Sequence, residues 1–394
     1  MTDKALEFIL EKRGWIKKRP ADLQERLERN DIILSIDEVR EVQSKARRQI
    51  KEPISDASIA EAIPENMSVR RIWVTPNGGT GVSYEKKKDS ETSFEQIEDS
   101  IRDLLESIAP VKTKRNAPSL NGRMLSVFST DKHIGAHTAS NSMYENVYNA
   151  QEVYNRHDRL IEKINDQAGI FGKFKILAFY DLGDPVDGAG GQTTRGGHGL
   201  PQNMDDREQI DTFIKVTIDT IEQLIADDIA EEIWFIATTN DNHAGSFGHG
   251  AVRAIQMYLE AKYPDVVKTK VSVQLLDHIT FGDHTYIFGH GKDDSDMKSG
   301  MPLNLDLKTE NFINDYIDRK KIRSPHIHLV KGDLHQSSVN YAKRFRYKNN
   351  MSMYGASKWI HTNFGSGDSG VDLEITDLNS EEIHETRITF GRDS

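Results

Sequence analysis

The chain has 394 residues, no cysteine, 29% charged residues and a formal net charge of -11. This length exceeds one ordinary domain and indicates two or three folded units. The lack of cysteine excludes disulfides, thiolate nucleophiles and Cys-based metal sites, so any metal must be bound by oxygen and nitrogen. No segment has the roughly 20 apolar residues of a membrane span, and the N-terminus lacks a signal-peptide core, which predicts a cytoplasmic protein with no membrane partner.

Residues 1–54 are predicted to form a helix-turn-helix-like module of three short helices. The third helix opens with a capping box from Ser35 to Glu38. Its apolar stripe consists of Ile36, Val39, Val42, Ala46 and Ile50. Arg40, Arg47 and Lys51 lie beside this stripe and raise the hypothesis of DNA binding. Residues 1–52 hold 13 Lys and Arg against 11 Asp and Glu, however, a basic density that solvated helix surfaces also reach.

Residues 55–121 are predicted to be a connector with some structure of its own. Residues 71–75 and 82–84 flank a glycine-rich turn and predict a hairpin, which could serve as the wing of the preceding module. An amphipathic helix follows and ends before Pro110. Residues 112–121 then form a basic, exposed linker.

Residues 122–394 alternate strand and helix patterns, which predicts an α/β fold. Strands are expected at 124–128, 174–180, 233–238, 271–276, 286–288 and 327–330. Helices are expected at 149–168, 207–227, 249–262 and 306–320. Residues 371–375 and 386–390 alternate apolar and polar side chains and predict a closing hairpin.

Short polar motifs follow five of these strands. They read Asp131-x-His133, Gly183-Asp184-x-x-Asp187, Asp241-Asn242-His243, Gly289-His290 and Gly332-x-x-His335. Each motif alone is commonly a turn or a surface pair. Because ligands bind beyond the carboxyl ends of strands in open α/β sheets, five such loops are expected to meet at one site.

This ordered series resembles the calcineurin-like metallophosphoesterases over about residues 122–390. The resemblance implies a sandwich of two mixed β-sheets flanked by helices, and hydrolysis of phosphate esters with two divalent metal ions. It also implies the ligands: Asp131, His133 and His335 for a first metal, Asn242 and His290 for a second, and Asp184 as the bridge between them. A shared carboxylate would offset the repulsion of two cations about 4 Å apart, with a hydroxide between them as nucleophile.

The same resemblance implies separate duties for two further residues. His243 matches the histidine that stabilises or protonates the departing alkoxide. Asp187 would orient that histidine and raise its pKa, as a carboxylate partner does.

Asp333 is one departure from the family pattern, because it stands where a second-metal histidine is usual. Ligation by Asp333 through oxygen would favour Mn²⁺, or Mg²⁺, over zinc. Mn²⁺ is therefore expected, with Mg²⁺, iron and Zn²⁺ as alternatives. In the other interpretation Asp333 points away and the second site is weak or empty.

Gly188 is the other departure, because protein serine/threonine phosphatases have a phosphate-binding arginine there. A glycine-rich loop follows with Arg195 and His198. These two residues and His137 are the candidate substrate-binding residues. The alternative is that this glycine-rich loop is simply mobile and has no role in substrate binding.

Three functions remain open from the sequence. The first is a phosphodiesterase or nuclease acting on DNA, which the helical N-terminal module and the missing arginine favour. The second is a phosphatase of small nucleotides or phosphomonoesters, which needs the same metal chemistry. The third is an inactive DNA-binding regulator with a relic phosphoesterase domain. The combination of modules resembles phage-encoded proteins, and the sequence does not indicate an oligomeric state.

Overall fold

The computed structural model of the chain describes residues 2–11, 20–28, 30, 32–49, 67–74, 80–86, 94–112, 118–119, 121–138, 148–191, 199, 202–292, 300–355 and 368–390. The chain divides into two compact units, Met1–Glu85 and Lys86–Ser394. In the described residues no helix is both long enough and apolar enough to span a bilayer.

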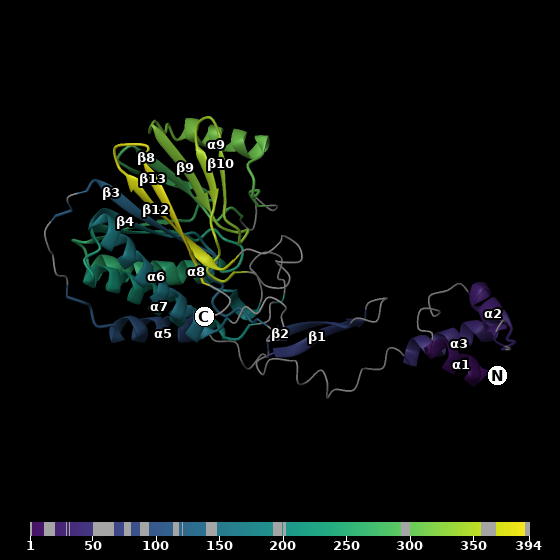
Figure 1. Ribbon diagram of the computed structural model, residues 1–394. Helices are drawn as coiled ribbons and strands as arrows, with labels where there is room; N and C mark the ends of the chain where they lie inside the picture. The colour runs from purple at the N-terminus through teal and green to yellow at the C-terminus, as the bar shows by residue number, and fades with distance from the viewer. Residues whose placement is uncertain are drawn as a thin grey trace. The chain divides into compact units, whose positions relative to one another are not determined.

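The described part of the first unit contains three helices and a pair of strands (Figure 1). Helices α1 (Thr2–Glu11), α2 (Pro20–Glu28) and α3 (Ile36–Gln49) enclose a small core. That core consists of Ala5, Ile9, Leu23, Leu27, Ile32, Leu34, Val39, Val42 and Ala46. Strands β1 (Met67–Val74) and β2 (Thr80–Lys86) form a two-stranded sheet, as the hairpin prediction required.

The start of α3 has the predicted capping box. The amide of Glu38 donates to Ser35 Oγ at 3.3 Å, and the amide of Ser35 donates to the Glu38 carboxylate at 2.8 Å. Ile36 does not belong to the buried stripe, because its side chain is 39% exposed. Arg40 pairs with Asp37 at 3.0 Å, so the acid on the same helix partly neutralises it. The side chains of Arg47, Ile50 and Lys51 lie outside the described residues.

The second unit is built on a six-stranded mixed sheet with the order β13-β12-β3-β4-β5-β6. Its strands are β3 (Arg123–Ser129), β4 (Phe174–Asp181), β5 (Ala230–Thr238), β6 (Val267–Ser272), β12 (Gly370–Asp377) and β13 (Ile383–Thr389). Strands β3 to β6 run parallel, and the C-terminal hairpin β12–β13 joins antiparallel to β3. The carboxyl ends of β3, β4 and β5 therefore meet at one edge.

A second mixed sheet has five strands in the order β10-β11-β9-β8-β7. Its strands are β7 (Asp277–Phe281), β8 (His284–Phe288), β9 (His326–Lys331), β10 (Ser338–Tyr341) and β11 (Arg346–Asn349). Strands β8, β9 and β11 are parallel to one another, and β7 and β10 are antiparallel to their neighbours.

The two sheets pack face to face and are covered by helices on their outer sides (Figure 1). Phe128 and Tyr180 of the first sheet contact Tyr286 of the second in the buried layer between them. Helices α5 (Phe94–Ser107), α6 (Ala150–Phe171), α7 (Asp206–Ala226) and α8 (Gly245–Lys262) cover the six-stranded sheet, and α9 (Leu307–Arg319) covers the other. This two-sheet sandwich confirms the predicted fold class.

Some predicted elements shift in the structure. The strand predicted at 271–276 is wrong: β6 occupies Val267–Ser272, and the side chain of Val273 is 63% exposed. This edge strand pairs only with β5, so its charged sequence has few apolar residues to reveal it. Helix α5, expected within the connector, packs against α7 and α8 of the second unit.

Candidate functional site

The loops that follow β3, β4, β8 and β9 are joined to one another by backbone hydrogen bonds. The amides of Asp131 and His133 donate to the carbonyls of Gly183 and Asp184, each at 3.0 Å. The amide of Gly332 donates to the carbonyl of His290 at 3.0 Å. The amide of Asp333 donates to Asp131 Oδ2 at 3.1 Å, and His290 Nδ1 lies 2.9 Å from the carbonyl of Leu182, so the predicted motifs of both sheets lie together at one edge of the sandwich.

Five of the predicted ligands have a left-handed backbone. Asp131, His133, Asp184, Asp333 and His335 have φ values of 50°, 44°, 48°, 75° and 55°. Only two other non-glycine residues in the described ranges have positive φ. Because this region is costly for residues with a Cβ, such clustering is typical of functional sites.

The motif glycines allow the loops to approach closely. A Cβ on Gly332 would lie 2.0 Å from Thr130 Oγ1 and 2.6 Å from Asp131 Oδ2. A Cβ on Gly183, which has φ +95°, would lie 2.9 Å from the His290 ring. Side chains at these two positions would displace the candidate ligands.

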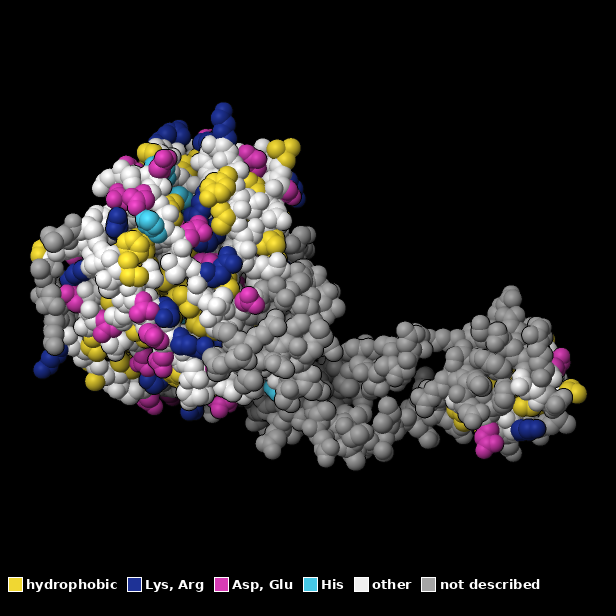
Figure 2. Space-filling view, viewed as in Figure 1, with side chains coloured by type: hydrophobic (Ala, Val, Ile, Leu, Met, Phe, Trp, Pro, Cys, Tyr) yellow, Lys and Arg dark blue, Asp and Glu magenta, His cyan; other side chains and the backbone are white. Residues whose placement is uncertain are grey.

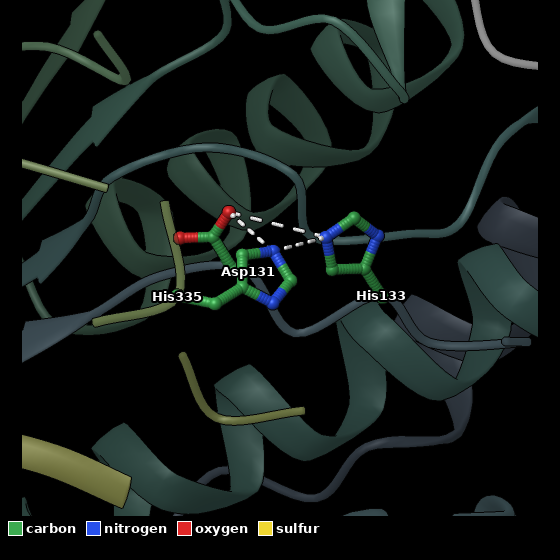
Figure 3. Close-up of side chains that lie close together, drawn as sticks. All are labelled: Asp131, His133 and His335. Carbon is green, nitrogen blue, oxygen red and sulfur yellow. Dashed lines mark hydrogen bonds and ion pairs between the residues drawn. The ribbon is translucent and has the colours of Figure 1, made fainter. Parts of the chain in front are cut away.

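Asp131, His133 and His335 form the first cluster (Figure 3). His335 Nε2 lies 3.3 Å from Asp131 Oδ1 and 3.2 Å from His133 Nε2. His133 Nε2 lies 3.9 Å from the same carboxylate oxygen. Ligand atoms about 2.1 Å from one ion lie about 3 to 3.4 Å apart, so the three atoms are close to the spacing of a metal site.

Asp184, Asn242 and His290 form the second cluster. His290 Nε2 lies 3.1 Å from Asp184 Oδ2 and 3.2 Å from Asn242 Oδ1. Asp184 Oδ2 also lies 3.8 Å from His133 Nε2 of the first cluster. The Asp184 carboxylate therefore stands between the two clusters, where the predicted bridge should be.

Three imidazoles are held through Nδ1 and present Nε2 to the clusters. His290 Nδ1 is 2.9 Å from the carbonyl of Leu182, and His335 Nδ1 contacts the carbonyl of Gly355. His133 Nδ1 is 3.4 Å from Asp187 Oδ1. Partners of this kind fix the tautomer and direction of metal-binding histidines.

The pKa shifts show how strongly the site attracts positive charge. Burial opposes the charge of Asp131 and Asp184, but His335 beside the first and His290 beside the second hold the pKa of each carboxyl below its usual range. Burial likewise disfavours charged histidine, yet Asp184 raises the pKa of His290 and Asp131 raises that of His335. Burial and the charge of Asp184 raise the pKa of Asp241 to about 7. The acids thus favour the protonated forms of His290 and His335, whereas burial lowers the pKa of His133.

The residues present fit divalent metal ions. Asp131 Oδ1 is buried and accepts no hydrogen bond from the described residues, although it faces the two histidines of its cluster. An orphaned carboxylate oxygen is costly unless a cation satisfies it. Carboxylate, amide and imidazole donors without sulfur suit Mn²⁺, Mg²⁺, iron or Zn²⁺.

His243 lies beside both clusters but is held differently from the expectation. Its Nδ1 is 2.8 Å from the backbone carbonyl of Asp187 and 4.0 Å from that residue's carboxylate. The carboxylate lies nearer to His133, so Asp187 contacts His243 through its backbone and His133 through its side chain. His243 remains 16% exposed at its side chain, which leaves it accessible to substrate.

Asp333 does not join either cluster. Its amide donates to Asp131 Oδ2 at 3.1 Å, while its own carboxylate lies 3.7 Å from Lys292 Nζ. A Cβ on Gly300 would lie 2.8 Å from Asp333 Oδ2, so the chain packs closely against this carboxylate. The Asp333 carboxylate thus faces Lys292, while its charge also helps to raise the pKa of His290, so whether Asp333 binds the second metal stays a prediction.

The candidate substrate-binding residues are not brought together in the described structure. His137 is exposed, just after the bridge between Ala136 and Gln202. Arg195 and His198 lie outside the described residues.

Two sets of hydrogen bonds that hold site residues in place are not predicted from the sequence. Gln202 Nε2 donates to Asp187 Oδ2 at 3.3 Å, behind the contact to His133. Ser352 Oγ and the Tyr354 amide donate to the carbonyl of Asp131 at 2.9 and 3.1 Å. None of these three residues belongs to a polar motif at a strand end, so only the fold reveals them.

Comparison with known proteins gives distant structural similarity. No family model and no curated protein matches the sequence. An archaeal phosphodiesterase matches with 10% identity and a TM-score of 0.33, over 67% of this chain and all of the other. Zinc-complexed Vps29 of Entamoeba histolytica matches with 10% identity and a TM-score of 0.28, over 68% of this chain and all of the other. Phosphoesterases are thus among the structures that this chain resembles.

A third match is GAP50 of Plasmodium, the anchor in the inner membrane complex, with 8% identity and a TM-score of 0.35, over 68% of this chain and 84% of the other. TM-scores this low carry no functional argument, and the roles named for the three proteins differ. The geometry of the site must therefore carry any functional assignment.

Proposed function

We propose that the chain is a metal-dependent phosphoesterase of the calcineurin-like kind, acting as a phosphodiesterase on DNA. One observation carries this proposal: six acid, amide and imidazole ligands from separate loops lie in two adjoining buried clusters. These ligands are Asp131, His133, Asp184, Asn242, His290 and His335. In the proposal the first cluster binds one ion, the second binds another, and Asp184 bridges them.

Divalent cations bound there would polarise the phosphoryl group and activate water for attack. The chain's own contribution is to hold the substrate and the leaving group. His243 lies 4.5 Å from the His133 ring, centroid to centroid, and is accessible enough to donate a proton to the departing oxygen. The Asp187 carbonyl fixes its Nδ1, which leaves Nε2 for that transfer.

The charge beside the second cluster supports a diester substrate. Lys292, two residues after His290, is already paired with Asp333. Without a free lysine at this position, the described part of the site has less to offer a dianionic monoester than a monoanionic diester. Small nucleotides and phosphomonoesters are the alternative substrates that a test must include.

The evidence for nucleic acid is weaker than the evidence for the metal centre. On the face of the second unit that Figure 2 shows, the described basic and acidic side chains are interspersed and form no basic stripe of the kind that tracks a phosphate backbone. In the first unit, Arg40 and Lys45 of α3 each pair with an acid of the same helix. The proposal that DNA is the substrate therefore rests mainly on the helical module that precedes the phosphoesterase unit.

A substrate panel with added Mn²⁺ tests the proposal. The purified chain is expected to hydrolyse a chromogenic phosphodiester faster than the matching monoester, and to cleave labelled single- or double-stranded DNA. Preference for the monoester would assign a phosphatase. Metal binding without hydrolysis of any substrate would support the inactive regulator.

A further inference from the structure

Asp241 stands immediately before the second-cluster ligand Asn242, and its side chain is buried between two loops. Its Oδ1 accepts hydrogen bonds from the amides of His243, Ala244 and Gly245 at 3.3, 2.8 and 3.2 Å. Its Oδ2 accepts one from the amide of Asp184 at 3.3 Å. One carboxylate thus contacts the loop after β4 and the loop after β5.

Two of these contacts satisfy backbone amides at the start of α8, those of Ala244 and Gly245. Helix amides of the first turn need an acceptor, which an N-cap side chain usually provides. Here the N-cap is Ala244, which has no polar side chain and makes no cap hydrogen bond. Asp241, three residues before the N-cap, supplies the carboxylate oxygen that accepts these amides. Its side chain therefore holds the turn with Asn242 and His243 against the first turn of α8.

The same carboxylate stabilises the strained backbone of the bridging ligand. Asp184 has φ 48°, a conformation that needs support from its surroundings. Asp241 binds its amide, while Asp184 Oδ1 accepts the amide of His243 at 3.0 Å. The two acids are therefore linked reciprocally across the loops after β4 and β5.

We infer that Asp241 is a positioning residue for the second metal and for His243. This role rests on the proposed metal centre, and it concerns the second cluster of that centre. In the part of the chain that the structure describes, the Asp241 side chain bonds to amides of the second-cluster loops, whereas Asp131, His133 and His335 of the first cluster are held by other groups. Loss of Asp241 should therefore weaken the second ion selectively.

The test measures Mn²⁺ binding to the full chain by calorimetric titration and by electron paramagnetic resonance, independently of substrate. The wild type is expected to bind two ions per chain and to show a spin-coupled pair. Asp241→Ala should weaken the second ion by about 10- to 100-fold and give the spectrum of an isolated ion, as loss of an outer ligand partner does. Asp241→Asn keeps one amide-accepting oxygen and should recover much of the second site.

Two matched controls remove helix caps that do not touch the site. Asp205 caps α7 and Asp306 caps α9, each through an oxygen that accepts a backbone amide. Asp205→Ala and Asp306→Ala should lower the melting temperature but keep both ions. If Asp241→Ala does not fold, Asp241→Asn decides, because its second ion should still bind more weakly than in the wild type.

Wild-type affinity for both ions in each folded Asp241 variant would overturn the role of Asp241 and leave the proposed function intact. A wild-type chain that binds no Mn²⁺ would overturn the metal centre and the role of Asp241 with it.

Discussion

The two clusters of the candidate metal centre are supported in different ways. The first cluster is held by several groups of the segment 350–355: Ser352 Oγ and the Tyr354 amide bind the Asp131 carbonyl, and the Gly355 carbonyl binds His335. The amide of Asn350 adds a bond to the Lys331 carbonyl at 2.8 Å. In the second cluster, the Asp241 side chain contacts both ligand loops through four amides, and two further contacts, of Asp184 Oδ1 with the His243 amide and of the Asp187 carbonyl with His243 Nδ1, also join these loops.

This difference indicates where the site should tolerate substitution. Support spread over main-chain groups survives the loss of one side chain, since the remaining bonds keep the loop in place. Support concentrated in one carboxylate does not. Substitutions near the first cluster should therefore have small effects on metal binding unless they remove a ligand. At the second cluster, metal binding should also weaken when a residue is substituted that only contacts the ligand loops, such as Asp241.

Asp184→Asn should have the largest effect, because both clusters share this carboxylate. Activity toward a chromogenic diester with Mn²⁺ should fall by more than the roughly 100-fold that loss of an outer partner costs. Asp166→Asn, on the exposed surface of α6, is the control and should match the wild type. Substantial turnover by Asp184→Asn would contradict the bridging role.

His243→Ala should come next and should leave both ions bound. Loss of a general acid should slow hydrolysis of DNA, which has a poor leaving group, by about 100-fold. The loss should be much smaller for a nitrophenyl ester, whose leaving group needs no proton. An equal loss with both substrates would argue against proton donation, and exposed His384→Ala is the matched control.

Asp333→Asn should have a modest effect, because its carboxylate faces Lys292 rather than either cluster. Both ions should remain, and the change in Mn²⁺ affinity should stay below about 10-fold, the lower limit for losing an outer partner. Titration of Mn²⁺ measures this directly. Loss of the second ion in Asp333→Asn would restore its predicted role as a ligand.

Ser352→Ala should have the smallest effect on the centre. It removes one hydroxyl bond to Asp131 and one from the Gly355 amide, worth about 1 kcal/mol each in unfolding free energy. The Tyr354 amide still binds the Asp131 carbonyl, so both ions should remain. If Ser352→Ala lost an ion as readily as Asp241→Ala, the contrast between the clusters would be wrong.

The sequence predicts the fold where strands are buried on both faces and misses it at the edges. The runs at β3, β4 and β5 lie in the interior of the sheet and are mostly apolar, so their pattern is clear. The sequence does not predict β7, β10 and β11, because these strands are short and mostly polar: β7 reads DHITF, β10 SVNY and β11 RYKN, although β11 is buried. Their position depends on pairing partners far along the chain.

The site shows a similar division between motif residues and their supports. Ligands at strand ends could be predicted, because the motif order together with parallel strands places them at one edge. The sequence shows Asp241 as part of a motif, but its role depends on which backbone amides donate to its carboxylate oxygens. The sequence identifies Asp187 as a site residue but does not predict which histidine its carboxylate contacts. Only the folded loop shows that this carboxylate lies nearer to His133 than to His243.

Anomalous diffraction from crystals of the full chain grown with Mn²⁺ tests the central claim most directly. We predict two manganese peaks about 4 Å apart, one among Asp131, His133 and His335 and the other beside Asn242 and His290, with Asp184 contacting both. A single peak, or peaks bound elsewhere in the molecule, would contradict the two-ion centre.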